Sequence, residues 1–193
     1  MSPGKSVALH PFRPVLNFSA LQRDVIRMAA FMAMMGDHIA TAFQLDMPLL
    51  NMAGRCAFPL FAFAVVMQMT CFLQAATVLN GVAAFTALVG YLPLSSASYG
   101  IPGLLMLAGA LLIWQVRDSL RPALFVVWLL LVALLNARHG DVMMLSGVIL
   151  TLAVLFCVHG LVPASGRRLQ AGRWFAPAYA LHLLCIGFLV SVL

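Results

Sequence analysis

The chain has 193 residues, of which 64% are hydrophobic and only 8% are charged, and its net charge is +6. A soluble domain carries about 25% charged residues, because a surface in contact with water needs them. Here all five acidic residues are aspartates, and the stretch from Cys56 to Val116 has no charged residue. The composition therefore excludes a soluble globular protein and favours membrane helices, since the apolar runs are continuous and do not alternate as strands of a membrane barrel would.

Seven stretches approach the length of about 20 apolar residues that a helix needs to cross a bilayer. The predicted transmembrane helices are Asp24–Phe43, Cys56–Gln74, Thr77–Pro93, Ile101–Val116, Pro122–Asn136, Val142–Leu161 and Phe175–Leu193. The fifth is short, and a weak polar signal alone divides the second from the third, so six or eight spans are alternatives. The sequence predicts an all-α, polytopic membrane helix bundle of about seven transmembrane helices, in which residues 23–193 form a single domain.

The first 22 residues are polar and contain Pro3, Pro11 and Pro14. They have no apolar segment of the kind that a cleavable signal peptide requires. We expect residues 1–22 to form an N-terminal arm in the cytosol. With that orientation, nine of the 11 Lys and Arg residues fall on the cytosolic side and only Arg55 and Arg138 fall outside.

This bias follows the positive-inside rule and predicts a multi-pass protein of the inner (cytoplasmic) membrane with a cytoplasmic N-terminus. Topology then accounts for the net positive charge, and no nucleic-acid partner is expected.

Four ionisable residues fall in or at the edge of the predicted spans, where an isolated charge costs roughly 2.5–3.5 kcal/mol on insertion scales. Asp37 and His38 lie past the middle of the first helix, Arg55 precedes the second, and His182 lies about two turns into the last. Adjacent residues on a helix do not face each other, so a direct Asp37–His38 dyad is not expected. If His38 is a general base, a group on another helix must orient it.

A short connection makes the first two helices antiparallel neighbours, so Asp37 and Arg55 are expected at similar depth. Arg55 or His182 is the natural counterpart of an ionised Asp37. Counted at about 1.5 Å per residue, His182 lies roughly 10 Å and His38 roughly 21 Å from the inner ends of their helices. The alternative interpretation is that these residues form a packing network that only fixes the helix positions.

Other polar positions have simpler interpretations. We expect His159 at the membrane interface, and His139 and Asp141 in a solvated outer turn. Pro59 would free a backbone carbonyl in its helix. The four cysteines lie in apolar runs without the spacing of metal ligands, so no metal site is expected.

Two basic connections lie on the predicted inner side. Topology explains their charge, and they are also candidates for binding an anionic co-substrate such as coenzyme A. The residues concerned are Arg117, Arg121, Arg167 and Arg168.

Three motifs carry a family resemblance. The first is Arg23-Asp24-Val25-Ile26-Arg27, followed by Ala30, Met34 and Asp37-His38-Ile39. The second is Arg55-Cys56-Ala57-Phe58-Pro59-Leu60-Phe61. The third is Tyr179-Ala180-Leu181-His182-Leu183. From about Arg23 to the C-terminus, the chain thereby resembles the TraX family of conjugal-transfer proteins. It departs from the family pattern in having Arg27 in place of Lys and Ala180 in place of Pro, and in lacking an Arg-Leu pair after the second helix.

The resemblance implies a membrane-embedded acetyltransferase of the bacterial inner membrane, distantly similar to multi-helix membrane acyltransferases. It further implies N-acetylation of a conjugative pilin subunit, with acetyl-CoA as donor. The implied partners are the pilin subunit, membrane lipids and other proteins of the conjugation machinery. The residues suit this chemistry, because an attacking amine must lose a proton to a base such as His38. Asp37 and Arg55 would orient groups or stabilise charge, and His182 would be a supporting proton or acyl carrier.

Other functions fit the same residues. One is a pilin-binding or assembly factor without enzymatic activity. Another is a different transfer reaction on the pilin terminus, and a third is a small transporter in which Asp37 and His38 relay protons. The absence of a detectable internal repeat argues against the transporter.

Overall fold

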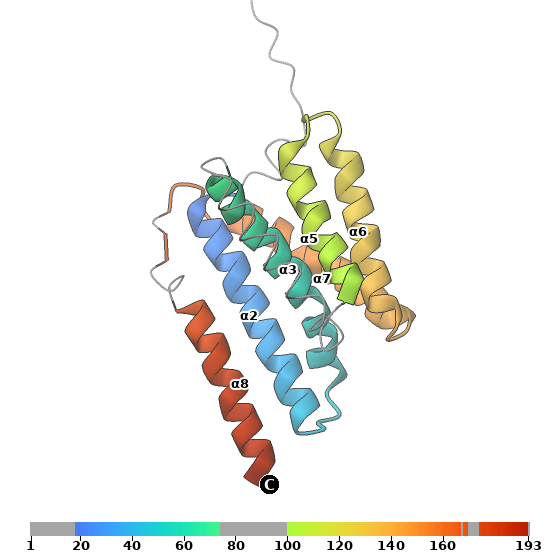
Figure 1. The fold of residues 1–193 in the computed structure, drawn as a ribbon, viewed down its shortest axis with the longest axis vertical. Coiled ribbons are helices and arrows are strands. Elements are labelled where there is room, and N and C mark those ends of the chain that lie inside the picture. Colours follow the sequence, from blue (N-terminus) through green and yellow to red (C-terminus); the bar gives the residue numbers. More distant parts are fainter. Residues whose placement is uncertain (1–17, 74–99, 167, 170–173, 193) are drawn as a thin grey trace, which may run out of the picture.

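A computed structural model describes residues 18–73, 100–166, 168–169 and 174–192 (Figure 1). These residues form six α-helices and no β-strand. The helices are α2 (Ala20–Ala42), α3 (Pro48–Leu73), α5 (Gly100–Gln115), α6 (Arg121–Ala137), α7 (Asp141–Leu161) and α8 (Phe175–Val192). The prediction of an all-α fold is confirmed for this part of the chain.

Six of the seven predicted spans correspond to these helices, and the third, Thr77–Pro93, lies outside the described residues. Most boundaries agree within a few residues. The exception is α3, which begins at Pro48 and not at Cys56. Proline is favoured in the first turn of a helix, because its missing N–H would have no partner there. Arg55 therefore lies two turns inside α3, and its predicted place at the helix entry is wrong.

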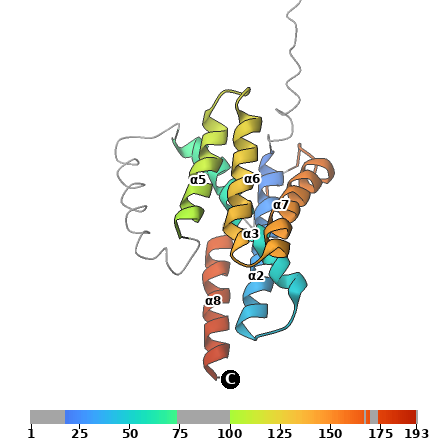
Figure 2. The same cartoon turned by 90° about the vertical axis from the view of Figure 1, so that its right-hand side faces the viewer.

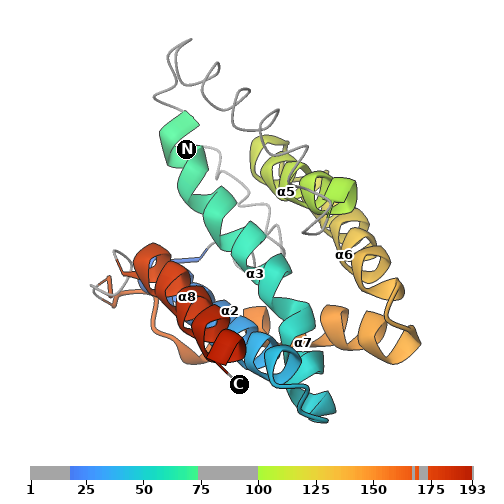
Figure 3. The same ribbon diagram turned by 60° about the horizontal axis from the view of Figure 1, so that its bottom comes forward.

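The helix α3 is the centre of the bundle. It packs against α2, α5 and α7, while α6 packs between α5 and α7. Figure 3 shows α3 between the α2–α8 pair and the α5–α6 pair, and Figure 2 shows α7 inclined to α6. The last helix, α8, lies at the edge of the bundle beside α2.

Aromatic residues fill the core between α3, α5 and α6. The ring of Phe63 lies 5.5 Å from that of Trp128 and 5.9 Å from that of Trp114, measured between centroids. The buried Trp128 indole donates a hydrogen bond to the Met106 carbonyl at 3.0 Å, which links α6 to α5. A buried indole N–H needs such a partner, so the contact also fixes how the two helices face each other.

The bundle has two distinct ends. The upper end in Figure 1 carries the start of α2 and the α5–α6 and α7–α8 connections. The lower end carries the α2–α3 connection and the C-terminus of α8, and the α6–α7 turn lies on the same side as these. The α5–α6 and α7–α8 connections, which carry basic residues, thus lie toward the same end as the start of α2, as the charge pattern predicts.

Apolar side chains cover the outward faces of the helices. Leu161, Leu184 and Phe188 are exposed by 82%, 70% and 68%. Soluble monomers rarely expose contiguous apolar patches of this kind, whereas lipid covers them in a membrane. By length and apolarity, one described helix, Asp141–Leu161, is sufficient to cross a bilayer. The count of seven spans and the cytoplasmic N-terminus remain predictions.

Candidate active site

His38 of α2 and His182 of α8 are in direct contact. The distance from His38 Nδ1 to His182 Nε2 is 3.1 Å, and the two rings are within 10° of parallel. One of the two nitrogens must carry the proton and the other must accept it, so the rings share a proton position. The ring of Phe31 meets His182 edge to face, with 5.9 Å between centroids. His182 is thus the group on another helix that orients His38.

The predicted difference in depth between these histidines is wrong. Because α8 begins lower in the bundle than α2, the second turn of α8 lies beside the fifth turn of α2 (Figure 1). His38 lies about 27 Å along α2 from Ala20, toward the lower end. The histidine pair is therefore remote from the basic upper end.

Asp37 and Arg55 form an ion pair between α2 and α3. The distance from Arg55 NH2 to Asp37 Oδ1 is 3.7 Å, and both side chains are mostly buried. Asp37 Oδ1 accepts no hydrogen bond from the described residues. A methyl group on Gly54 would overlap the Asp37 side chain, so glycine is what permits this approach. The expectation that Asp37 and Arg55 lie at similar depth is confirmed.

His139, in the α6–α7 turn, also contacts this ion pair. Its Nε2 lies 3.3 Å from Arg55 NH1. A guanidinium can only donate, so Nε2 accepts and the ring proton of His139 is on Nδ1. The imidazole is exposed, so the prediction that His139 lies in a solvated turn is confirmed, and the contact with Arg55 is an addition that the sequence did not indicate. Asp37, His38, Arg55, His139 and His182 are called the lower cluster below.

The backbone of Arg55 is held by a second polar contact. Pro59 lies within α3 and has no N–H, so the carbonyl of Arg55, four residues earlier, loses its helical donor. Asn136 Nδ2 of α6 donates to this carbonyl at 3.4 Å and to the Val132 carbonyl at 3.0 Å. The Asn136 side chain is 1% exposed. A methyl group on Gly147 of α7 would overlap it, so three helices meet closely at this point.

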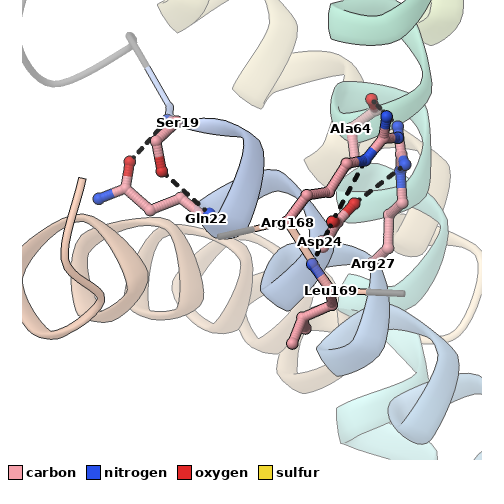
Figure 4. Close-up of polar contacts among 7 residues, drawn as sticks. All are labelled: Ser19, Gln22, Asp24, Arg27, Ala64, Arg168 and Leu169. Carbon is pink, nitrogen blue, oxygen red and sulfur yellow. Dashed lines mark hydrogen bonds and ion pairs between the residues drawn. The ribbon is translucent and has the colours of Figure 1, made fainter. Parts of the chain in front are cut away.

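A separate polar cluster joins the start of α2 to the α7–α8 connection (Figure 4). Asp24 is 1% exposed and lies 3.4 Å from Arg27 NH1 and 3.4 Å from Arg168 Nε. Its Oδ2 also accepts the Leu169 backbone N–H at 3.1 Å. Arg27 NH2 donates to the Ala64 carbonyl of α3 at 3.3 Å. Asp24, Arg27, Arg168 and Leu169 are called the upper cluster below.

The four arginines predicted to bind an anionic co-substrate have different surroundings. Arg117 is exposed, while Arg121 pairs with Asp118 at 2.9 Å and lies near the Trp114 ring. Arg168 is 58% exposed and pairs with Asp24, and Arg167 lies outside the described residues. The two connections share the upper end but lie on opposite sides of α2 and α3 (Figures 1 and 3). Among the described residues, the arginines of these two connections therefore do not line one common binding site.

The lower cluster has the groups that an acyl transfer to an amine requires. It combines imidazoles that can take up a proton with a cation that can stabilise a developing negative charge. Sequence reasoning found four of its five members and missed His139, whose only signal was its place beside Arg138. It also missed Gly54, Asn136 and Gly147 as the residues that permit the contacts, because glycine and asparagine occur at many helix contacts in membrane proteins.

The chain matches known sequences over most of its length. The model of the family described as "TraX protein" matches residues 22–85 and 62–190. Protein TraX of Escherichia coli is 29% identical over 90% of this chain and 89% of that protein. Protein TraX of Escherichia coli strain K12 is 27% identical over 91% of this chain and 90% of that protein. No solved structure matches.

Proposed function

The chain belongs to the TraX family, and we propose that it is an integral membrane N-acetyltransferase that modifies the N-terminus of a conjugative pilin subunit. Acetyl-CoA is its proposed donor. The observation that carries this proposal is the contact between His38 and His182 beside the Asp37–Arg55 ion pair. The proposal places one reacting carbonyl between these imidazoles, which come from α2 and α8, and the Arg55 guanidinium of α3.

The reaction assigns a role to each group. The pilin amine attacks the thioester carbonyl, a C–N bond forms, and the amine proton passes to the His38–His182 pair. Arg55 stabilises the oxyanion of the tetrahedral intermediate. When that intermediate collapses, the C–S bond breaks and the thiolate of coenzyme A leaves. Asp37 holds Arg55 in place.

The two ends of the bundle suggest where each substrate enters. We assign the donor phosphates to the upper end, where Arg117 in the α5–α6 connection and Arg168 in the α7–α8 connection are exposed. The acceptor amine is assigned to the lower end, which the positive-inside rule places outside the cytoplasm. Because about 27 Å of α2 separates Ala20 from His38, the reactive end of the donor must reach into the bundle, away from its phosphates.

The intact mass of the cognate pilin, with peptide mapping of its N-terminus, tests this proposal. It is measured in cells with the wild-type protein, with His38→Ala, and with His159→Ala as the matched control. His159 is an imidazole on α7 that contacts Phe18 outside the lower cluster. We expect an acetyl-sized increment in the wild type and the control, and none in His38→Ala at equal membrane abundance.

Three other outcomes contradict the proposal in different ways. Unmodified pilin in all three strains, with normal pilus assembly, would favour an assembly factor. A different mass increment that depends on His38 would favour another transfer reaction on the pilin terminus. Acetylated pilin at the wild-type level in His38→Ala would remove His38 from the mechanism.

A further inference from the structure

The position of α8 decides whether the histidine pair forms. This helix packs chiefly against α2, and Leu181, Leu184 and Phe188 point away from the bundle with 63%, 70% and 68% exposure. Such apolar surface contacts lipid equally well in many orientations of the helix. Packing alone therefore gives α8 little reason to hold His182 opposite His38.

The upper cluster supplies a second attachment for α8. Arg168 and Leu169, in the connection that leads to α8, both bind Asp24 Oδ2, at 3.4 Å through Nε and at 3.1 Å through the backbone N–H. Asp24 is in the first turns of α2, the helix that also carries His38. One helix thus holds α8 at two points, the carboxylate of Asp24 and the imidazole of His38.

The attachment shortens the chain that leads to α8. Gln22 Nε2 fixes the end of α7 through the Val162 carbonyl at 2.8 Å. From Val162 to Phe175 there are 13 residues (175 − 162), whereas from Leu169 there are six (175 − 169). Because the probability of bringing two chain ends together falls roughly as the −3/2 power of length, releasing Leu169 lowers the local concentration of α8 about threefold.

We propose that Asp24 is a positioning residue for the candidate active site, which holds the α7–α8 connection against α2 and thereby keeps His182 in contact with His38. Asp24 acts on α8 through Arg168 and Leu169. Its pairing with Arg27 instead links α2 to α3, because Arg27 donates to the Ala64 carbonyl. This role rests on the proposed function only in treating the histidine pair as an active site, since the contact between positions 38 and 182 can be measured without any substrate.

The test measures cross-linking between positions 38 and 182 in native membranes. The full chain carries His38→Cys and His182→Cys in a background without its four natural cysteines, and a short bifunctional thiol reagent joins the two positions. The rate is compared between the parent and a variant with Arg168→Gln and Leu169→Pro. This variant removes both contacts from the connection but keeps the buried Asp24–Arg27 pair.

Two matched controls change the same end of the bundle without releasing the connection. Arg121→Gln breaks the ion pair with Asp118, which is 2.9 Å long and lies in the α5–α6 connection. Leu169→Ala shortens the side chain and keeps the N–H that Asp24 accepts. We expect cross-linking about threefold slower in the Arg168→Gln/Leu169→Pro variant and unchanged in both controls.

An unchanged rate in the Arg168→Gln/Leu169→Pro variant would overturn the inference. If that variant does not accumulate in the membrane, Arg168→Gln and Leu169→Pro are measured separately, since each removes one of the two contacts with Asp24 Oδ2, and the inference fails if neither slows cross-linking. Slower cross-linking in a strain whose wild-type protein leaves pilin unmodified would sustain the positioning role of Asp24 while disproving acetylation.

Discussion

Asn136 of α6 donates its side-chain amide to the carbonyl of Arg55, the carbonyl that Pro59 leaves without a helical donor. The carboxamide from one helix thus completes the backbone hydrogen bonding of another, directly at the residue that pairs with Asp37. A helix interrupted by proline in a membrane needs such a partner, because no water is present to replace it.

Asn136→Leu is expected to lower the free energy of unfolding by about 1–3 kcal/mol, since it leaves the Arg55 carbonyl buried and unsatisfied. Pro59→Ala restores an N–H to α3, so the same Asn136 substitution should cost less in that background. The coupling energy between the Asn136 and Pro59 substitutions is measured by thermal unfolding, in detergent, of the four proteins of this double-mutant cycle. Additive effects of the two substitutions would show that the amide does not serve this carbonyl.

Gly54→Ala is expected to separate α2 from α3, because a methyl group there would overlap the Asp37 side chain. Overpacking of this kind costs about 1–3 kcal/mol, and the Asp37–Arg55 ion pair should lengthen with loss of pilin modification. Gly160→Ala is the matched control, since a methyl group there meets nothing within 4 Å. Melting temperature and pilin mass report the two effects, and equal behaviour of both variants would contradict the packing argument.

His38 and His182 should behave as one unit in catalysis. His38→Ala is expected to reduce the acetylation rate by about 10²–10⁴, the usual contribution of a general base. Adding His182→Ala should then produce no further loss, because residues that act together are not additive. Initial rates with purified pilin or an N-terminal pilin peptide measure this, and multiplied losses in the double variant would assign the two histidines to independent steps.

The sidedness of the bundle can be measured directly. His139→Cys, in a background without the natural cysteines, should react with a membrane-impermeant maleimide added to intact spheroplasts. Ser119→Cys, exposed in the α5–α6 connection at the upper end, should react only after the membrane is opened. The reverse pattern would invert the proposed orientation. Labelling of both positions from outside would contradict their placement at opposite ends of the bundle.

Arg117→Gln should raise the KM for acetyl-CoA severalfold and leave kcat unchanged, because an exposed cation attracts the donor without touching the reacting atoms. Salt should reduce the difference between wild type and variant, since the Debye length shortens to about 3 Å at 1 M. Steady-state rates at two ionic strengths test this. A fall in kcat with unchanged KM would remove Arg117 from donor binding.

Sequence reasoning predicted the helices well wherever a single apolar run defined them. It placed the start of α3 too late because it put the charged Arg55 at the helix entry, whereas in the structure Asp37 pairs with Arg55 from the neighbouring helix. The pairing of Asp37 with Arg55 was still predictable, because only residues 43–47 separate α2 from α3.

The contacts between distant segments could not be predicted. The register of α8 on α2 depends on residues 144 and 145 positions apart in the chain, and no local pattern encodes it. Asp24 similarly has the sequence context of an ordinary acidic residue near a helix start, while its burial depends on Arg168 and Leu169. Charge, periodicity and proline positions therefore predict elements, but the alignment of the first and last described helices comes only from tertiary packing.

The division of the histidine pair between α2 and α8 has a consequence for biosynthesis. At about 5–20 residues per second, a ribosome needs roughly 7–30 s to pass from one histidine to the other. During that time α2 and α3 are already made and can pair, but the nascent chain lacks His182, the imidazole that contacts His38. On the proposed mechanism, a chain arrested before α8 is inserted lacks half of the histidine pair, so the pair forms only when synthesis and insertion of α8 are complete.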